Sequence, residues 1–371
     1  MTFRPGRLAW FIWLLGALLI SVLVWLQPLE RTVTPIYRSA AEAWVERAPL
    51  YTPEQLRGYY NLPQFALLYR PFAALPVPVG AILWRIVSLA VLATGVRRLV
   101  LLAPTDQAAR RWLGATLLVL PATLSAARNG QSNLLLAGLM CHAVSALAMS
   151  RWWRAAALLT LSLASKQLGL VMILLAPFGY RRVAGPLAGG LALLFLLPFA
   201  AAPAAYVWEQ YGLLADTMTA QAPAPEHRFC DFNGALHTLG IHLPAAAALA
   251  IRLAAALLTL AVWWRTARRI AEPARALLLL GLAAVYLMLF NPMTETNSYV
   301  ILAPAVAAFA IWRGPPRGLL IAIAIGLGSE NLGDPIFPLT DLWLKAVLAA
   351  VFGVLLLREV HAADPALPRR L

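Results

Sequence analysis

Four polar clusters interrupt a strongly apolar sequence, and they contain the side chains best suited to chemistry. The clusters span residues 38–51, 128–133, 165–167 and 291–299. Polar groups at membrane depth are costly to desolvate and are therefore usually functional. The cations, the carboxylate and the amides that stand out are Arg38, Arg128, Lys166, Glu295, Asn129, Gln131, Asn133, Asn291 and Asn297.

These residue types suit a ligand that combines a phosphate with hydroxyl groups, because Arg and Lys neutralise phosphate oxygens and amides can bond sugar hydroxyls. Each cluster also has a purely structural interpretation. Arg128 could anchor a membrane interface, and Asn129-Gly130 is a good turn. Lys166 could reach the lipid headgroups, and Asn291-Pro292 could stop a helix. The functional interpretation therefore requires that the clusters lie together.

The composition places these clusters in a membrane protein. Of the 371 residues, 61% are hydrophobic and 12% are charged, whereas soluble domains are about a quarter charged. Apolar stretches of about 20 residues can cross a bilayer as helices, and backbone in lipid must satisfy its own hydrogen bonds. We therefore predict one all-α polytopic domain, residues 1–371, with about twelve membrane helices (ten to twelve) at 8–26, 76–96, 112–127, 133–150, 155–166, 168–180, 184–202, 244–264, 276–290, 299–312, 317–329 and 341–357.

The distribution of Lys and Arg predicts the orientation of the chain. With both termini in the cytoplasm, every cytoplasmic connection carries a basic cluster, such as Arg97-Arg98 or Arg181-Arg182, and acidic residues predominate at the other face. The four polar clusters then share the non-cytoplasmic side. Two short segments flank Lys166. They form either a hairpin of short helices or one broken helix, and one broken helix would invert the downstream orientation.

The predicted outer loops are long, at about 27–75 and 203–243, and both carry aromatic residues, acids and prolines. Residues 38–47 contain few turn formers and can form a helix. That helix either lies solvated on the outer surface or roofs a site in the membrane.

Several function classes are excluded or disfavoured. The net charge of +14 is spread in pairs of basic residues, without the continuous basic face of a nucleic-acid-binding protein. Phosphate-binding loops, nucleophile elbows and zinc motifs are absent from the sequence. Cys141 and Cys230 are the only cysteines, so a disulfide framework is not expected. We expect no cofactor and no strong metal site. Weak binding of a divalent ion by carboxylates of the outer loops stays an open alternative.

The layout resembles the multispanning C-type glycosyltransferases, and more closely glycosyltransferase family 87. The block from Arg128 to Leu134 is similar to the Asn-Gly-Gln-x-Asn block of that family. Weaker similarities cover roughly residues 8–312: Tyr37 to Ala41 with Pro49-Leu50-Tyr51, Tyr60-Asn61-Leu62-Pro63 with Tyr69 to Phe72, Lys166 after a small-residue helix, and Asn291 to Tyr299.

The resemblance implies transfer of a hexose, mannose-like, from a polyprenyl-phosphate donor to a glycolipid or glycan acceptor at the outer face, with inversion. It implies substrate-binding roles for Tyr37, Tyr51 and the polar clusters, and a place in the bacterial inner membrane, building the cell envelope. Family members carry an acid in the first outer loop, whereas this chain reads Arg31-Thr32-Val33-Thr34-Pro35-Ile36. The candidate bases are therefore Glu295, then Glu42, then Asp231.

Two other functions remain open from the sequence. A secondary transporter or lipid flippase for an anionic or lipid-linked substrate would also have about twelve helices with basic cytoplasmic loops. Transporters, however, are commonly built from repeats with broken helices at the midplane, and no repeat is evident here. The third function is that of a non-catalytic membrane assembly subunit.

Overall fold

The computed structural model describes residues 4–51, 58–220, 229–312, 317–333 and 336–362, and the secondary structure of these residues is entirely helical. Each predicted apolar segment coincides with a helix, although the boundaries differ by a few residues. The matching helices are α1 (Pro5–Leu26), α4 (Val77–Val100), α5 (Ala108–Asn129), α6 (Asn133–Ala148), α7 (Trp152–Ser165), α8 (Leu170–Gly179), α9 (Ala184–Ala201), α12 (Ala245–Thr266), α13 (Ala274–Phe290), α14 (Ala303–Trp312), α15 (Arg317–Gly326) and α17 (Leu344–Ala362).

The apolar helices mark the chain as a membrane protein. In the described part, four helical stretches are long and apolar enough to cross a bilayer unaided: Pro5–Leu26, Val77–Val100, Arg181–Ala201 and Ala245–Thr266. Other apolar helices, such as α6 and α13, are shorter. The count of twelve crossings therefore stays a prediction.

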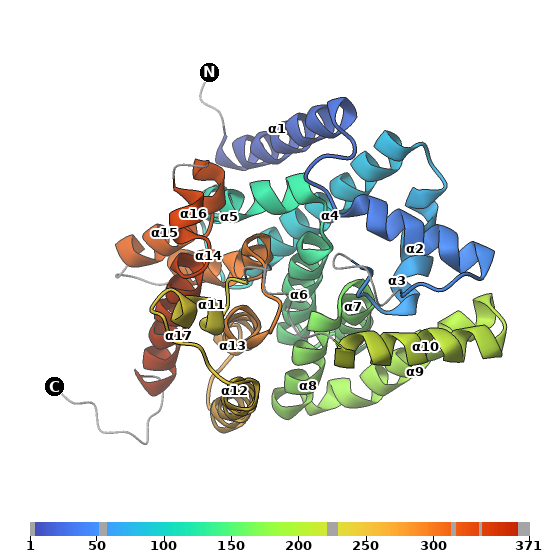
Figure 1. The fold of residues 1–371 in the computed structure, drawn as a ribbon. Helices are drawn as coiled ribbons and strands as arrows, with labels where there is room; N and C mark the ends of the chain where they lie inside the picture. The colour runs from blue at the N-terminus through green and yellow to red at the C-terminus, as the bar shows by residue number, and fades with distance from the viewer. Residues whose placement is uncertain (1–3, 52–57, 221–228, 313–316, 334–335, 363–371) are drawn as a thin grey trace.

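The helix α6 lies in the middle of the bundle and is buried along nearly its whole length (Figure 1). It packs against α4, α7 and α13. Small residues allow the closest of these contacts: a Cβ atom on Gly95 would lie 2.6 Å from the carbonyl oxygen of Gly138. Close approach through small residues is a usual way to pack helices in membranes, where no hydrophobic effect drives helices together.

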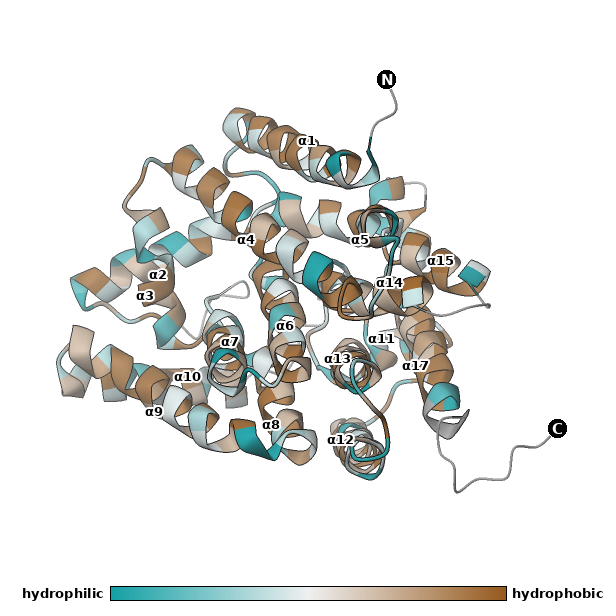
Figure 2. Cartoon of the chain, turned by 180° about the vertical axis from the view of Figure 1, so that it is seen from behind, coloured by the Kyte–Doolittle hydropathy of each residue, from teal (hydrophilic) through white to brown (hydrophobic). Residues whose placement is uncertain are grey.

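The helix α12 lies at the periphery and exposes apolar side chains. Its exposed leucines include Leu249, Leu253 and Leu257, which recur every four residues along one face. Hydropathic colouring shows α12, α9 and α1 as largely apolar helices at the edges of the bundle (Figure 2). An exposed apolar face of this length suits contact with lipid tails.

The two short segments around Lys166 form a hairpin rather than one broken helix. The helix α7 ends at Ser165, Lys166 is extended, and a 3-10 turn η1 (Gln167–Gly169) leads into α8. The far ends of the two helices meet again, because the Trp152 and Tyr180 ring centroids lie 6.4 Å apart. The predicted orientation of the downstream helices requires a hairpin here, and that orientation stays a prediction.

The two predicted long loops contain helices, most of which the sequence analysis missed. The helix expected at 38–47 is α2 (Thr34–Glu46), whereas α3 (Pro63–Ala73), α10 (Ala204–Ala220) and α11 (Phe232–His237) were not predicted. The apolar side of α2 is buried against α3 rather than solvated, and both contribute to an aromatic cluster beside the main core. Its members include Tyr37, Trp44, Phe65, Tyr69, Trp84 and Tyr206.

Candidate active site

The turn between α5 and α6 sets the position of the Asn-Gly-Gln-x-Asn block. Gly130 ends α5 with φ +74°, a left-handed conformation that glycine adopts without strain. Arg85 is buried on α4 and donates hydrogen bonds to the carbonyl oxygens of Ala127 and Arg128, at 2.9 Å each. These bonds satisfy carbonyls that the end of a helix leaves without an intrahelical partner.

A continuous hydrogen-bond network joins three of the four polar clusters. The Nε2 of Gln131 donates to Oε2 of Glu295 at 2.5 Å, and the Nδ2 of Asn133 donates to Oε1 of Gln131 at 2.5 Å and to Ser298 Oγ at 3.1 Å. Lys166 Nζ donates to Oδ1 of Asn133 at 2.7 Å. We call Gln131, Asn133, Lys166, Glu295 and Ser298 the amide network. It joins one of the three predicted cations, the predicted carboxylate Glu295 and two of the predicted amide side chains.

Glu295 immediately precedes a 3-10 helix, η3 (Thr296–Ile301), and the backbone on both sides of Glu295 is fixed. The backbone N–H of Cys230 donates to the Thr294 carbonyl at 2.7 Å. Lys345, on α17, donates to the Thr296 carbonyl at 2.9 Å and also pairs with Glu330. The Glu295 carboxylate is therefore held on a rigid segment even though it lies outside a long helix.

Lys166 reaches the network because α7 ends immediately before it. Its backbone is extended, with φ −165° and ψ 141°, and its neighbour Gln167 donates from Nε2 to the Tyr60 carbonyl. This contact ties the hairpin to the segment that precedes α3. The lysine is partly buried, and its ammonium group bonds Asn133.

The helix α2 meets the network through Tyr37. This side chain is 7% exposed, and its hydroxyl oxygen accepts a hydrogen bond of 3.3 Å from the backbone N–H of Ser132. Its ring packs edge-on against Phe65 and Trp84. Burial is the main cause that raises the pKa of Tyr37, so the hydroxyl stays protonated at neutral pH.

The other predicted residues of the first loop have partners outside the amide network. Arg38 donates two hydrogen bonds to the Leu75 carbonyl, at 2.9 and 2.8 Å, and lies 3.0 Å from the Glu42 carboxylate. The Glu42 side chain is 52% exposed. Tyr51 is buried and donates to the Asn61 carbonyl at 2.7 Å.

Three other predicted residues, on either side of the network in sequence, also have partners outside it. Arg128 donates to Gln27 Oε1 at 2.9 Å, and the Asn129 carbonyl accepts from the backbone N–H of Val33 at 3.0 Å. Asn291 donates to Thr294 at 3.2 Å.

Two buried polar oxygens next to the network have no hydrogen-bond partner among the described residues: Ser132 Oγ and Asn297 Oδ1. An unpaired buried polar group costs about 1–3 kcal/mol. Ser132 lies between Gln131 and Asn133 in sequence, and Asn297 lies beside Ser298. These unpaired groups suit a site that completes its hydrogen bonds with a polar ligand.

Asp231, the third candidate base, has a structural role. Its carboxylate accepts from the Gly234 N–H at 2.9 Å, which caps α11, and it forms an ion pair with Arg252 at 3.2 Å. Burial is the main cause that raises the pKa of Asp231. Its two oxygens are therefore already engaged.

The sequence analysis missed three residues that position the network. Ser298 bonds Asn133 directly, Arg85 holds the turn before Gln131, and Lys345 holds the segment after Glu295. Arg85 and Lys345 gave a usable signal, because each is a lone cation in an apolar segment and must find buried partners. Ser298 gave no such signal, because a serine hydroxyl has a low desolvation cost and occurs in many buried and exposed positions.

The network combines one carboxylate with one ammonium group, two amides and a hydroxyl in a partly buried setting. A carboxylate can accept a proton from an attacking hydroxyl, and an ammonium group can stabilise negative charge that develops on a leaving phosphate. Amide groups can orient a sugar by its hydroxyls. The arrangement is therefore suited to group transfer from a phosphate to a hydroxyl.

No curated protein is similar enough to this chain to be matched. The family model of glycosyltransferase family 87 matches residues 59–292. This range is well over half of the 371 residues and contains Gln131, Asn133 and Lys166, whereas Glu295 follows just beyond its end. Together with the apolar helices, the match shows that the chain belongs to glycosyltransferase family 87 and is a membrane glycosyltransferase.

Proposed function

We propose that the protein transfers a hexose, mannose-like, from a polyprenyl-phosphate donor to a hydroxyl of a glycolipid or glycan at the non-cytoplasmic face of the membrane, with inversion. The observation that carries this proposal is the contact of Gln131 with Glu295 within a network that also holds Lys166. Transfer from a phosphate-linked sugar needs a carboxylate to accept the acceptor proton, a cation to stabilise the leaving phosphate and amides to orient the sugar.

In this mechanism the acceptor oxygen attacks the anomeric carbon from the face opposite the phosphate. Glu295 takes the hydroxyl proton, a bond forms between the acceptor oxygen and the anomeric carbon, and the bond from that carbon to the phosphate oxygen breaks. The electron pair leaves with the polyprenyl phosphate, whose new charge Lys166 stabilises. A single displacement of this kind inverts the anomeric configuration.

Glu295 is favoured over Glu42 as the base because of its surroundings. Glu295 is partly buried and is oriented by the Gln131 amide, whereas Glu42 is half-exposed and faces Arg38 on its own helix. Orientation of a base within hydrogen-bond reach of its target matters more than its mere presence. We therefore assign Gln131 to orient the base, and Asn133 to orient the ammonium group of Lys166.

The donor and the acceptor reach the site from different directions in this proposal. The donor tail is an apolar chain and must remain in lipid, so the phosphate approaches from the membrane. Tyr37, Tyr51 and Arg38 lie on the side of the network covered by α2 and α3, and we propose that they bind substrate there. We propose that four further polar residues also contact the substrates: Arg128, Asn129, Asn291 and Asn297.

The test is a reconstitution of the full-length protein in proteoliposomes with radiolabelled polyprenyl-phosphate mannose or glucose and candidate glycolipid acceptors. The proposal predicts a covalent product whose new linkage has the anomeric configuration opposite to that of the donor. Labelled sugar that crosses the membrane without a covalent product would instead identify a transporter. A product that retains the configuration would exclude direct displacement.

A further inference from the structure

A cavity lined by several arginines lies at the far end of α6 from the amide network. Its volume is about 220 Å³. The helix α6 begins at Asn133, in the network, and ends at Ala148, beside the cavity. At about 1.5 Å per residue, its 16 residues separate the two sites by roughly 24 Å.

The lining of the cavity has a net positive charge. Arg181, Arg182 and Arg275 line it, and among the described lining residues Glu272 supplies the only carboxylate. That carboxylate is paired with Arg275, whose Nε lies 2.7 Å from Oε1. The charges of Arg181 and Arg182 are not offset by an ion pair with a described residue. The cavity therefore favours an anion.

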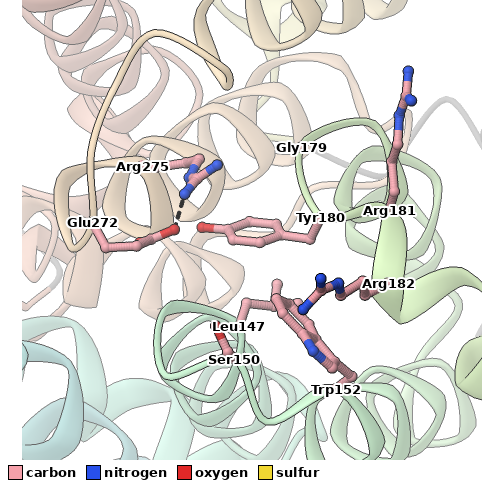
Figure 3. A pocket seen from close by; sticks show the side chains of 9 residues that line it. All are labelled: Leu147, Ser150, Trp152, Gly179, Tyr180, Arg181, Arg182, Glu272 and Arg275. Carbon is pink, nitrogen blue, oxygen red and sulfur yellow. Dashed lines mark hydrogen bonds and ion pairs between the residues drawn. The ribbon is translucent and has the colours of Figure 1, made fainter.

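The buried hydroxyl of Tyr180 and the carboxylate of Glu272 face each other in the cavity, although neither the hydroxyl nor Oε2 of Glu272 makes a well-formed hydrogen bond to a described residue. The Tyr180 side chain is only 4% exposed. Its ring crosses the cavity toward Glu272 and Arg275, and Arg182 extends toward Tyr180 and Trp152, whereas Arg181 points away (Figure 3). A ligand phosphate beside the Arg182 guanidinium group would therefore draw the Tyr180 hydroxyl away from Glu272 and leave Oε2 of Glu272 as an acceptor.

The surroundings of the cavity indicate a lipid rather than a soluble anion. Trp153 is 78% exposed next to Arg154, and aromatic residues beside basic residues mark a membrane interface. The helix α8 leads to the cavity and exposes Leu170, Leu174 and Phe178 at intervals of four residues. These side chains form one apolar stripe on the helix, along which an acyl chain can lie.

We propose that this cavity binds the headgroup of an anionic phospholipid, with phosphatidylglycerol as the best match. Its phosphate accepts hydrogen bonds from Arg182 and the Tyr180 hydroxyl, its glycerol hydroxyl donates to Oε2 of Glu272, and an acyl chain follows the stripe on α8. The site is separate from the amide network, and the proposal does not depend on the transferase reaction.

The test uses the full-length protein in detergent micelles and measures the binding of phosphatidylglycerol by native mass spectrometry and by the rise of Tm. The proposal predicts binding that is about tenfold weaker in Arg182→Gln, because one charge-assisted bond is lost, and weaker in Tyr180→Phe, which removes only the hydroxyl. Arg97→Gln is the control, since Arg97 is an exposed arginine at the end of α4 that does not line the cavity.

Three results would overturn the proposal. Binding by Arg182→Gln and Tyr180→Phe equal to that of the unmodified protein would remove the assigned contacts. Equal stabilisation by phosphatidylcholine or phosphatidylethanolamine would remove the requirement for a net negative headgroup. Displacement of the lipid by glycerol phosphate at low concentration would show that the cavity recognises a soluble phosphate and that the acyl stripe plays no part.

Discussion

The side-chain amide of Gln131 donates a 2.5 Å hydrogen bond to the carboxylate of Glu295, although the two residues are 164 positions apart in the chain. Gln131 follows the turn that ends α5, and Glu295 precedes the 3-10 segment η3. Because each residue sits on an independently fixed segment, the carboxylate has a defined direction before any substrate binds. This relationship is the basis of the active-site assignment.

Replacement of Lys166 tests its proposed contact with the donor phosphate. Lys166→Met should raise KM for the polyprenyl-phosphate sugar roughly 10- to 100-fold, because a charge-assisted hydrogen bond contributes about 1.5–3 kcal/mol. Lys166→Arg should restore part of the affinity. Steady-state kinetics in proteoliposomes measures both. Unchanged donor affinity in Lys166→Met would mean that the lysine only contacts Asn133 or the lipid headgroups.

Lys345 is expected to act through position rather than contact with substrate. It is 1% exposed, pairs with Glu330 and donates to the Thr296 carbonyl next to Glu295. Lys345→Met should lower the free energy of unfolding by about 3–5 kcal/mol, because it leaves a buried carboxylate unpaired.

The double variant Lys345→Met/Glu330→Gln separates stability from positioning. It should recover most of the lost stability, as measured by thermal unfolding, because no unpaired charge remains. Its transfer rate should stay low, since the bond to the Thr296 carbonyl is still missing. A double variant that is stable and fully active would show that this contact does not position Glu295.

The turn at Gly130 offers a test with a matched control. Gly130→Ala and Gly240→Ala both place a side chain at positive φ, +74° and +76°, and each should cost about 1–2 kcal/mol of stability. A Cβ on Gly130 would also lie 2.7 Å from the Arg85 guanidinium, whereas one on Gly240 meets nothing within 4 Å. Only Gly130→Ala should therefore reduce transfer activity as well. Equal activity of the two variants would contradict the role of Arg85.

Stability should fall at alkaline pH through the tyrosines beside α2 and α3. Burial is the largest cause that raises the pKa of Tyr37, Tyr51 and Tyr59 above 10.0. The unfolded chain loses these protons first, so stability is intact below about pH 10 and falls above it, by up to about 1.4 kcal/mol per pH unit for each tyrosine. Unfolding free energies measured across this range give the slope, and Tyr51→Phe should make it shallower. If the pH dependence of the unfolding free energy were unchanged in Tyr51→Phe, Tyr51 would not be one of the tyrosines that cause the loss of stability.

Much of the fold was predictable because the bilayer restricts its choices. Long apolar stretches such as 8–26 and 244–264 must be helices, and their centres were correctly predicted. The helix α3 was not predicted, because it begins at a proline, contains Pro71 and has no continuous apolar run. Its stability comes from the aromatic cluster with α2 and α4, which no local pattern reveals.

The membership of the site was easier to predict than its contacts. Gln131, Asn133, Lys166 and Glu295 were predicted to share one face, and the structure brings them into one network. Arg38 and Tyr51 were grouped with them, but their hydrogen bonds go to the carbonyls of Leu75 and Asn61. Which carbonyl a side chain reaches depends on the tertiary packing of α2 and α3, and residue type alone does not fix it.

The most direct test of the assigned active site is the single-turnover rate of sugar transfer in three glutamate variants. Glu295→Gln should lower the rate roughly 10²- to 10⁴-fold, because an amide cannot accept the proton of the acceptor hydroxyl as a carboxylate does. Glu42→Gln and the control Glu46→Gln, both on the exposed side of α2, should remain near the rate of the unmodified protein. A fully active Glu295→Gln, or a large loss confined to Glu42→Gln, would contradict the account.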